Sequence, residues 1–118
     1  MTVEELNKLV TERYYKSKEV LISKNKEYGQ THDVLESFRH QAAFSMHAEP
    51  TSVAWELMVK HLYSVRRIIA EYECEGILPD PDMIDEKFGD AINYLMLTEA
   101  LFKEIRNNST VKLSEGEL

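Results

Sequence analysis

Cysteine is almost absent from this chain of 118 residues: Cys74 stands alone and cannot form an internal disulfide. The composition therefore argues against a disulfide-rich secreted module. The chain has no run of about 18 apolar residues, so we expect no transmembrane helix and no membrane partner. Its acidic start, Met1-Thr2-Val3-Glu4-Glu5, is not followed by the apolar segment of a signal peptide. A cytoplasmic location is the resulting expectation.

Basic residues are few, with 14 Lys and Arg against 21 Asp and Glu and a net charge of −7. A nucleic acid polymer requires a basic surface, so we expect no such partner. Local basic residues could still hold a small phosphorylated ligand. The acidic excess favours solubility and is compatible with metal binding.

The spacing of apolar residues predicts an all-α fold without strands. Helix starts are indicated by the capping-box pattern Thr2-Val3-Glu4-Glu5, by Thr51 as an N-cap, and by Asp80 before Pro81. Gly76 is a typical residue after a helix end. The predicted helices span residues 2 to 24 or 26, about 33 to 46, 51 to 76, and 81 to about 106.

Long helices joined by short loops predict an antiparallel four-helix bundle. Residues 1–108 would form one helical domain, and the polar residues 109–118 a flexible tail. A domain of this size has a small core, so a partner subunit would help to stabilise it and we expect a homo-oligomer.

The third predicted helix has the clearest apolar pattern. Trp55, Met58, Leu62, Val65 and Ile69 recur at spacings of three and four, which predicts one stripe facing the core.

The opposite side of this helix carries Glu56, Lys60 and Arg67. This side could be a solvent face with an i,i+4 pair between Glu56 and Lys60. Alternatively, Glu56 could be a metal ligand, and Lys60 or Arg67 could contact a phosphate.

The segment from Asp85 to Leu95 contains the most informative pattern. Glu86 and Asp90 are four residues apart, which on a helix separates their Cβ atoms by about 5–6 Å. Asn93 lies beside them, on the flank of a broad apolar arc. Such a carboxylate pair can bind one divalent cation, so we take Glu86 and Asp90 as candidate metal ligands and Asn93 as a candidate ligand-binding residue.

The first predicted helix places polar residues on an apolar line: Arg13, Ser17 and Lys24 follow Leu6 and Val10. Long side chains can extend past apolar surface to water. Alternatively, these residues point into a polar cavity.

The end of this helix, Lys24-x-Lys26-x-Tyr28-Gly29, leads into a glycine where the backbone could approach a ligand closely. We therefore add Lys24, Lys26, Tyr28 and Gly29 to the candidate ligand-binding residues. Together with Lys60-His61-x-x-x-x-Arg66-Arg67 and Glu86-Lys87-Phe88-Gly89-Asp90-Ala91-Ile92-Asn93-Tyr94-Leu95, this element resembles small phage and prophage proteins of the nucleotide modification associated domain. Those proteins look distantly similar to the MazG-like all-α nucleoside triphosphate pyrophosphohydrolases.

The resemblance covers roughly residues 24–101. It implies an oligomeric helical bundle that acts on nucleotide metabolism in a bacterial host cytosol, with a nucleotide as ligand and Mg²⁺ as cofactor. In the catalytic MazG-like enzymes, a Glu-x-x-Glu on one helix and a Glu-x-x-Asp on another hold the metal. Asp90 matches the terminal Asp, whereas Lys87 occupies the position of the preceding Glu and the second Glu of the first pair is missing after Glu56.

Three functions follow as alternatives. The first is a Mg²⁺-dependent nucleotide pyrophosphohydrolase, the second a non-catalytic protein that binds or sequesters a nucleotide, and the third a helical oligomer that binds a protein partner. A metal bound by one or two carboxylates and completed by phosphates is compatible with the first two.

Overall fold

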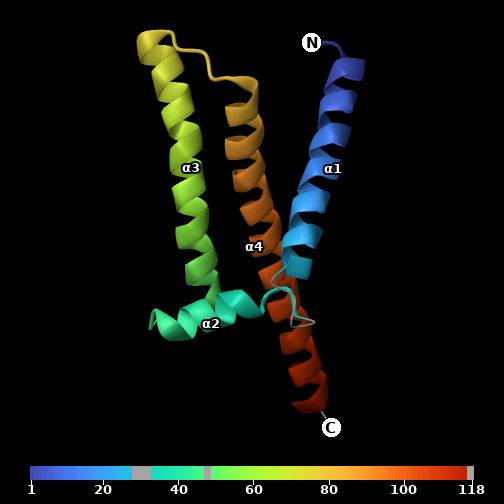
Figure 1. The fold of residues 1–118 in the computed structure, drawn as a ribbon. Helices are drawn as coiled ribbons and strands as arrows, with labels where there is room; N and C mark the ends of the chain where they lie inside the picture. The colour runs from blue at the N-terminus through green and yellow to red at the C-terminus, as the bar shows by residue number, and fades with distance from the viewer. Residues whose placement is uncertain (28–32, 47–48, 117–118) are drawn as a thin grey trace.

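The computed structural model describes residues 1–27, 33–46 and 49–116, of which residues 24–27 and 110–116 are described by their backbone only. The described residues form four helices, α1 (Val3–Glu27), α2 (Glu36–Phe44), α3 (Pro50–Glu75) and α4 (Pro81–Gly116), and no strand (Figure 1). The all-α prediction is therefore confirmed. None of the helices in this part of the chain is both long and apolar enough to cross a membrane.

Three helix boundaries are set by the predicted capping residues. The Thr2 hydroxyl accepts a hydrogen bond from the Glu5 backbone N–H, and the Glu5 carboxylate accepts one from the Thr2 N–H, both at 3.1 Å. Gly76 ends α3 in the left-handed conformation, with φ of 67°. The Asp80 carboxylate accepts a hydrogen bond from the Met83 N–H at 3.0 Å and caps α4.

Two other starts differ from the prediction. The predicted start of the second helix at Asp33 is too early, because the Asp33 carboxylate accepts a hydrogen bond from the Leu35 N–H at 3.0 Å and forms a turn before Glu36. Thr51 does not cap α3. The helix already begins at Pro50, whose ring fixes φ at a helical value, and the extended residue Glu49 precedes it.

The last helix is longer than predicted. It continues past Arg106 to Gly116, so the predicted end of the helix is wrong, and the flexibility of the tail stays a prediction. Asn, Ser and Thr are weaker helix formers than Ala by only a few tenths of a kcal/mol each. Four such residues in a row therefore do not suffice to end a helix.

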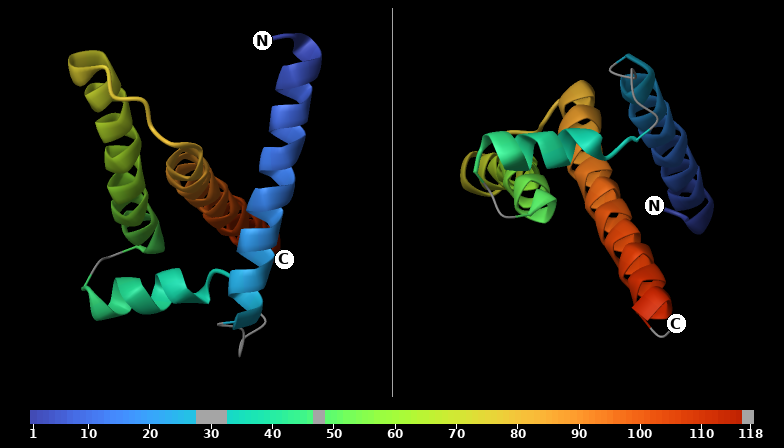
Figure 2. Two further views of the ribbon diagram at one scale, coloured as in Figure 1. Left: turned by 45° about the horizontal axis from the view of Figure 1, so that its top comes forward. Right: turned by 90° about the horizontal axis from the view of Figure 1, so that it is seen from below.

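The helices do not close around one core. α3 and α4 form an antiparallel pair, α2 lies across the start of α3, and α1 contacts only α4 among the described helices (Figures 1 and 2). The radius of gyration is 17.9 Å, and the molecule extends over 61 × 35 × 29 Å. A compact domain of this length has a radius of gyration of about 13.5 Å, so the chain is open rather than globular.

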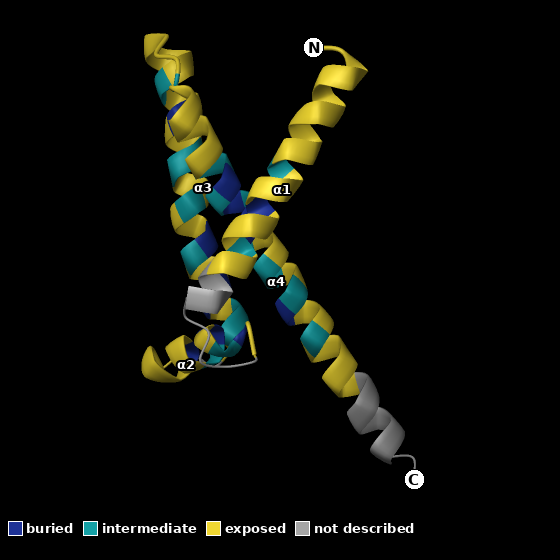
Figure 3. Cartoon of the chain, turned by 45° about the vertical axis from the view of Figure 1, so that its right-hand side comes forward, coloured by how far each residue is buried: buried dark blue, intermediate teal, exposed yellow. Residues whose placement is uncertain are grey.

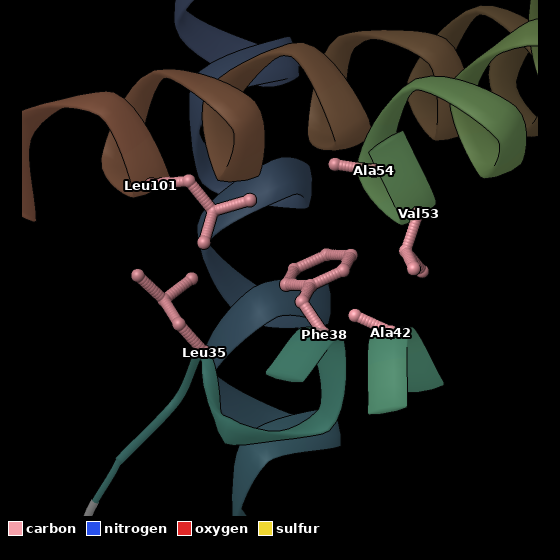
Figure 4. Packing of buried hydrophobic residues seen from close by; sticks show 6 residues of the cluster. All are labelled: Leu35, Phe38, Ala42, Val53, Ala54 and Leu101. Atoms are coloured by element: carbon pink, nitrogen blue, oxygen red, sulfur yellow. The ribbon is translucent and has the colours of Figure 1, made fainter. Parts of the chain in front are cut away.

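The main core lies where α2, α3 and α4 meet (Figure 4). Phe38, which is only 4% exposed, occupies its centre, and it is surrounded by other buried apolar side chains: Leu35, Ala42, Val53, Ala54 and Leu101. At the edge of this core, the Arg39 guanidinium donates hydrogen bonds to the carboxylate of Asp33 and to that of Glu104 on α4. These contacts fix α2 against the α3–α4 pair.

The predicted core stripe of α3 is mostly exposed (Figure 3). Met58 is buried, but Trp55 is 57% exposed, and Leu62 and Ile69 are exposed too. Only α2 and α4 cover α3, so its buried arc is narrow and includes Ile68 instead. The apolar spacing predicts a helix face that is suited to burial, but no other described element covers most of that face.

Candidate functional site, a polar cleft between α1 and α4

α1 crosses α4 (Figure 3). A cleft of about 480 Å³ lies between residues of these two helices. Arg13 and Ser17 line it from α1, and Glu86, Asp90 and Asn93 line it from α4. The three α4 residues share one side of the cleft because they are four and seven residues apart on one helix. The cleft thus brings together the acidic pair and the polar residues of α1.

The crossing is held by one carboxylate that pairs with two basic side chains. Asp85 accepts hydrogen bonds from Arg13 Nη2 at 3.2 Å and from Lys16 Nζ at 2.8 Å. The hydrogen bond from Lys16, followed by the charges of Lys16 and Arg13, holds the pKa of the Asp85 carboxyl below its usual value despite partial desolvation. Gly89 permits the close approach, since it presents no side chain to the Arg13 guanidinium.

Two buried polar side chains of the cleft each contain an oxygen atom that has no hydrogen-bond partner among the described residues. Ser17 is 3% exposed and Asn93 is 7% exposed. Within the described residues, neither Ser17 Oγ nor Asn93 Oδ1 has a hydrogen-bond partner. Leaving a buried polar atom unpaired costs about 1–3 kcal/mol, so such atoms call for an explanation by bound water, an ion or a ligand.

Asp90 lies between the cleft and α3. Its Oδ2 atom is 3.7 Å from His61 Nδ1, and the His61 ring stacks on Tyr94 with the ring centroids 4.7 Å apart. Burial, and to a smaller extent the Asp90 charge, raises the pKa of the Tyr94 hydroxyl. The Asp90–His61 distance exceeds that of a direct hydrogen bond, so the carboxylate keeps oxygen lone pairs for another ligand.

The predicted three-residue metal site does not assemble in this chain. Glu86 and Asp90 both line the cleft, but Glu56 does not. Over the described ranges 1–27, 33–46 and 49–116, no group of three or more His, Cys, Asp or Glu residues could hold a metal ion. Glu56 lies on α3. The direction in which its side chain points depends on how α3 packs against α4, and the spacing of residues within α3 does not predict this.

The predicted phosphate contacts also lie elsewhere. Lys60 is exposed on α3, and Arg67 pairs with Glu71 at 3.1 Å beside a different hollow between α3 and α4. Lys24 and Lys26 belong to α1, but their side chains are not described. The predicted ligand-binding residues Tyr28 and Gly29 lie outside the described residues.

The cations of the cleft are Arg13 and Lys16 instead. For Arg13 and Ser17, the structure agrees with the second alternative, that they point into a polar cavity. The sequence did not predict three other residues of the cleft, which are Lys16, Asp85 and Gly89. Gly89 was the available signal, because a glycine inside a helix can mark a place where another group approaches the backbone closely.

Comparisons with known proteins add no relative. No protein-family model matches the chain, and neither a curated protein nor a solved structure does so. A proposal about the function therefore rests on the residues of the cleft.

Proposed function

We propose that the α1–α4 cleft binds a nucleotide together with Mg²⁺, in a protein that works as a homo-oligomer. The observation that carries the proposal is a pair of buried atoms, Ser17 Oγ and Asn93 Oδ1, that have no hydrogen-bond partner among the described residues and belong to the same cleft as Glu86 and Asp90. The Ser17 hydroxyl can donate to a phosphate or ribose oxygen, whereas Asn93 Oδ1 only accepts and suits a ribose hydroxyl. The two carboxylates suit a hard divalent cation.

The charge of the cleft makes the metal a requirement. Two cations, Arg13 and Lys16, face five carboxylates, giving a formal charge of −3; the carboxylates are those of Glu19, Asp82, Asp85, Glu86 and Asp90. A nucleotide carries negative charge itself and would be repelled. Mg²⁺ is commonly held by one or two carboxylates with phosphate oxygens and water as its other ligands, so a metal bridging Glu86, Asp90 and the phosphates reverses the repulsion.

Binding without turnover is the form of this function that the residues support best. The described chain provides a two-carboxylate site and lacks the second acidic pair that would hold a metal independently of the ligand. Lys87 adds a positive charge 3.6 Å from Glu86, where the resembled enzymes carry an acid. Hydrolysis of the bound nucleotide is therefore one outcome that the binding experiment has to distinguish.

Thermal unfolding with a panel of nucleoside mono-, di- and triphosphates, with and without Mg²⁺, tests the proposal. We expect stabilisation only when nucleotide and Mg²⁺ are both present, amounting to about 2.7 kcal/mol at 100 times Kd. Asp90→Asn and Glu86→Gln should abolish it. Glu73→Gln, which removes an exposed carboxylate of α3 outside the cleft, should not.

Each other outcome has a clear meaning. Stabilisation that is equal without Mg²⁺, or unchanged in Asp90→Asn, would contradict the proposed site. Pyrophosphate release from a stabilising triphosphate would add hydrolysis to binding. A panel without any stabilisation would leave the partner-binding helical oligomer as the better account.

A further inference from the structure

The chain exposes more surface than a monomer of its mass should. Its accessible surface is 9625 Å² for a mass of 13.7 kDa. A compact monomer of that mass exposes about 6,600 Å², which leaves about 3,000 Å² in excess. Part of this excess belongs to the projecting end of α4 (Figure 1). A standard interface needs only about 800 Å² from each partner, so enough surface remains for a stable dimer.

Part of the exposed apolar surface lies beside the crossing of α1 and α4. Leu6, Val10 and Tyr14 follow one another at four-residue spacing on α1, and Val10 and Tyr14 are 55% and 58% exposed. A groove of about 360 Å³ begins at Val10 and Tyr14 and runs between the two helices. Its apolar lining consists of Val10, Tyr14, Leu21, Ile22, Ile92 and Met96.

The stripe and the groove are complementary when a second α1 is placed antiparallel to the first. The stripe covers residues 6–14 of α1, and the groove borders residues 10–22, so the two share Val10 and Tyr14. In an antiparallel pair, each stripe therefore reaches the partner's groove at the same time. Such reciprocal contact between identical surfaces is what a two-fold axis produces.

The charges of α1 fit the same arrangement. Residues 3–12 contain three Glu and one Lys, a net charge of −2, while residues 13–23 contain three basic residues and one Glu, a net charge of +2. Asp85 offsets one of the basic charges, since it pairs with Arg13 and Lys16. An antiparallel pair places the acidic half beside the basic half, whereas a parallel pair places like charges together.

We propose that a second copy of this chain packs against the groove between α1 and α4, with the two α1 helices antiparallel about a two-fold axis near residue 12. The two α1 and two α4 helices then form a four-helix bundle between the copies. This interface does not depend on the proposed nucleotide, although Arg13 and Ser17 line both the groove and the polar cleft.

Sedimentation velocity of the full chain between 1 and 100 µM tests the surface. We expect a particle of twice 13.7 kDa for the wild type. Val10→Glu should weaken its association at least tenfold. Val59→Glu is the matched control, because Val59 is an exposed valine on α3 outside the groove. A monomeric wild type, or dissociation by Val59→Glu and not by Val10→Glu, would overturn the proposal.

Disulfide cross-linking tests the relative orientation of the two α1 helices. Circular dichroism first verifies that each variant is folded. In a Cys74→Ser background, chains carrying Asn7→Cys are mixed with chains carrying Lys18→Cys. An antiparallel pair with its axis near residue 12 brings these two positions together and separates the two Asn7 positions by about 16 Å along the axis. Disulfides should therefore form in the mixture and not in Asn7→Cys alone. The reverse result would establish a parallel pair and refute the arrangement.

Discussion

Gly89 on α4 lies directly against the guanidinium of Arg13 on α1: a Cβ at position 89 would come within 2.5 Å of Arg13 Nη1. Arg13 and Gly89 both line the cleft that the two helices form. The obstacle is the far end of a flexible side chain, so a small substitution displaces the guanidinium and a large one displaces the helix.

Substitutions at Gly89 should therefore separate by size. Gly89→Ala improves helix propensity by about 1 kcal/mol. It also disturbs a partly exposed ion pair, and such pairs contribute about 0–1 kcal/mol. We expect a change in the free energy of unfolding of less than about 1 kcal/mol for Ala and a clear loss of stability for Gly89→Leu, both measured by urea denaturation. Equal stability of the two variants would show that α1 does not pack on α4 at this residue.

Gly76 provides the control for this comparison. Its φ of 67° is unfavourable for other residues, yet a Cβ there would meet no atom within 4 Å. Gly76→Ala should lower stability by about 1–2 kcal/mol through the backbone alone.

Asp85 should make stability depend on pH in the acidic range. Its pKa is lowered, first by the hydrogen bond from Lys16. A lowered carboxyl pKa means that the folded state favours the ionised form, so the stabilisation is fully present above the unfolded pKa of about 3.9 and disappears as the pH falls through the lowered value. Asp85→Asn should destabilise the protein at pH 7 and lose that effect once Asp85 is protonated.

Asp82→Asn is the matched control, since it removes another carboxylate from the start of α4, and no ion pair involves it among the described side chains. The relevant measurement is the difference between the two variants in urea denaturation at pH 7 and at about pH 2. A difference that persists at the acidic pH would mean that the Asp85 charge is not responsible.

Phe38 should dominate the stability of the α2–α3–α4 core. It is buried among five other apolar side chains, whereas Phe44 on the same helix is 92% exposed. Phe38→Ala should cost about 3–5 kcal/mol, the range for a buried aromatic. Phe44→Ala should change the free energy of unfolding by less than about 0.5 kcal/mol, because truncating an exposed side chain leaves no cavity. Denaturation curves that show equal losses would contradict the placement of this core.

The sequence predicted those features that depend on neighbouring residues. Gly76 and Asp80 set helix ends through their own conformation and hydrogen bonds. Glu86, Asp90 and Asn93 share the cleft because one helix carries them at suitable spacing. Features that depend on how one helix is rotated against another could not be obtained in this way.

Glu56 illustrates that limit, since its distance from Asp90 depends on the packing of α3 against α4 and not on any local spacing. The stripe from Trp55 to Ile69 shows a second limit: an apolar pattern indicates that a helix face is suited to burial but does not say which element buries it. In this chain α2 and α4 cover only part of α3, and much of the stripe stays exposed.

Ser17 should lower the stability of the ligand-free protein and strengthen ligand binding. Ser17→Ala removes a buried hydroxyl whose oxygen has no partner, so we expect it to raise the free energy of unfolding without ligand by up to about 1–3 kcal/mol. Ser64→Ala is the control for the gain in helix propensity, because the Ser64 hydroxyl donates to the Lys60 carbonyl at 3.3 Å on a helix of similar length. The difference between the two variants in urea denaturation gives the effect of the buried hydroxyl on the free energy of unfolding.

The same variants test binding. With Mg²⁺ and a nucleotide that stabilises the wild type, Ser17→Ala should lose part of the ligand-induced stabilisation and Ser64→Ala should keep it. If Ser17→Ala were destabilising without ligand, the hydroxyl would already be satisfied in the empty protein, and the cleft would lose its main evidence for a missing partner.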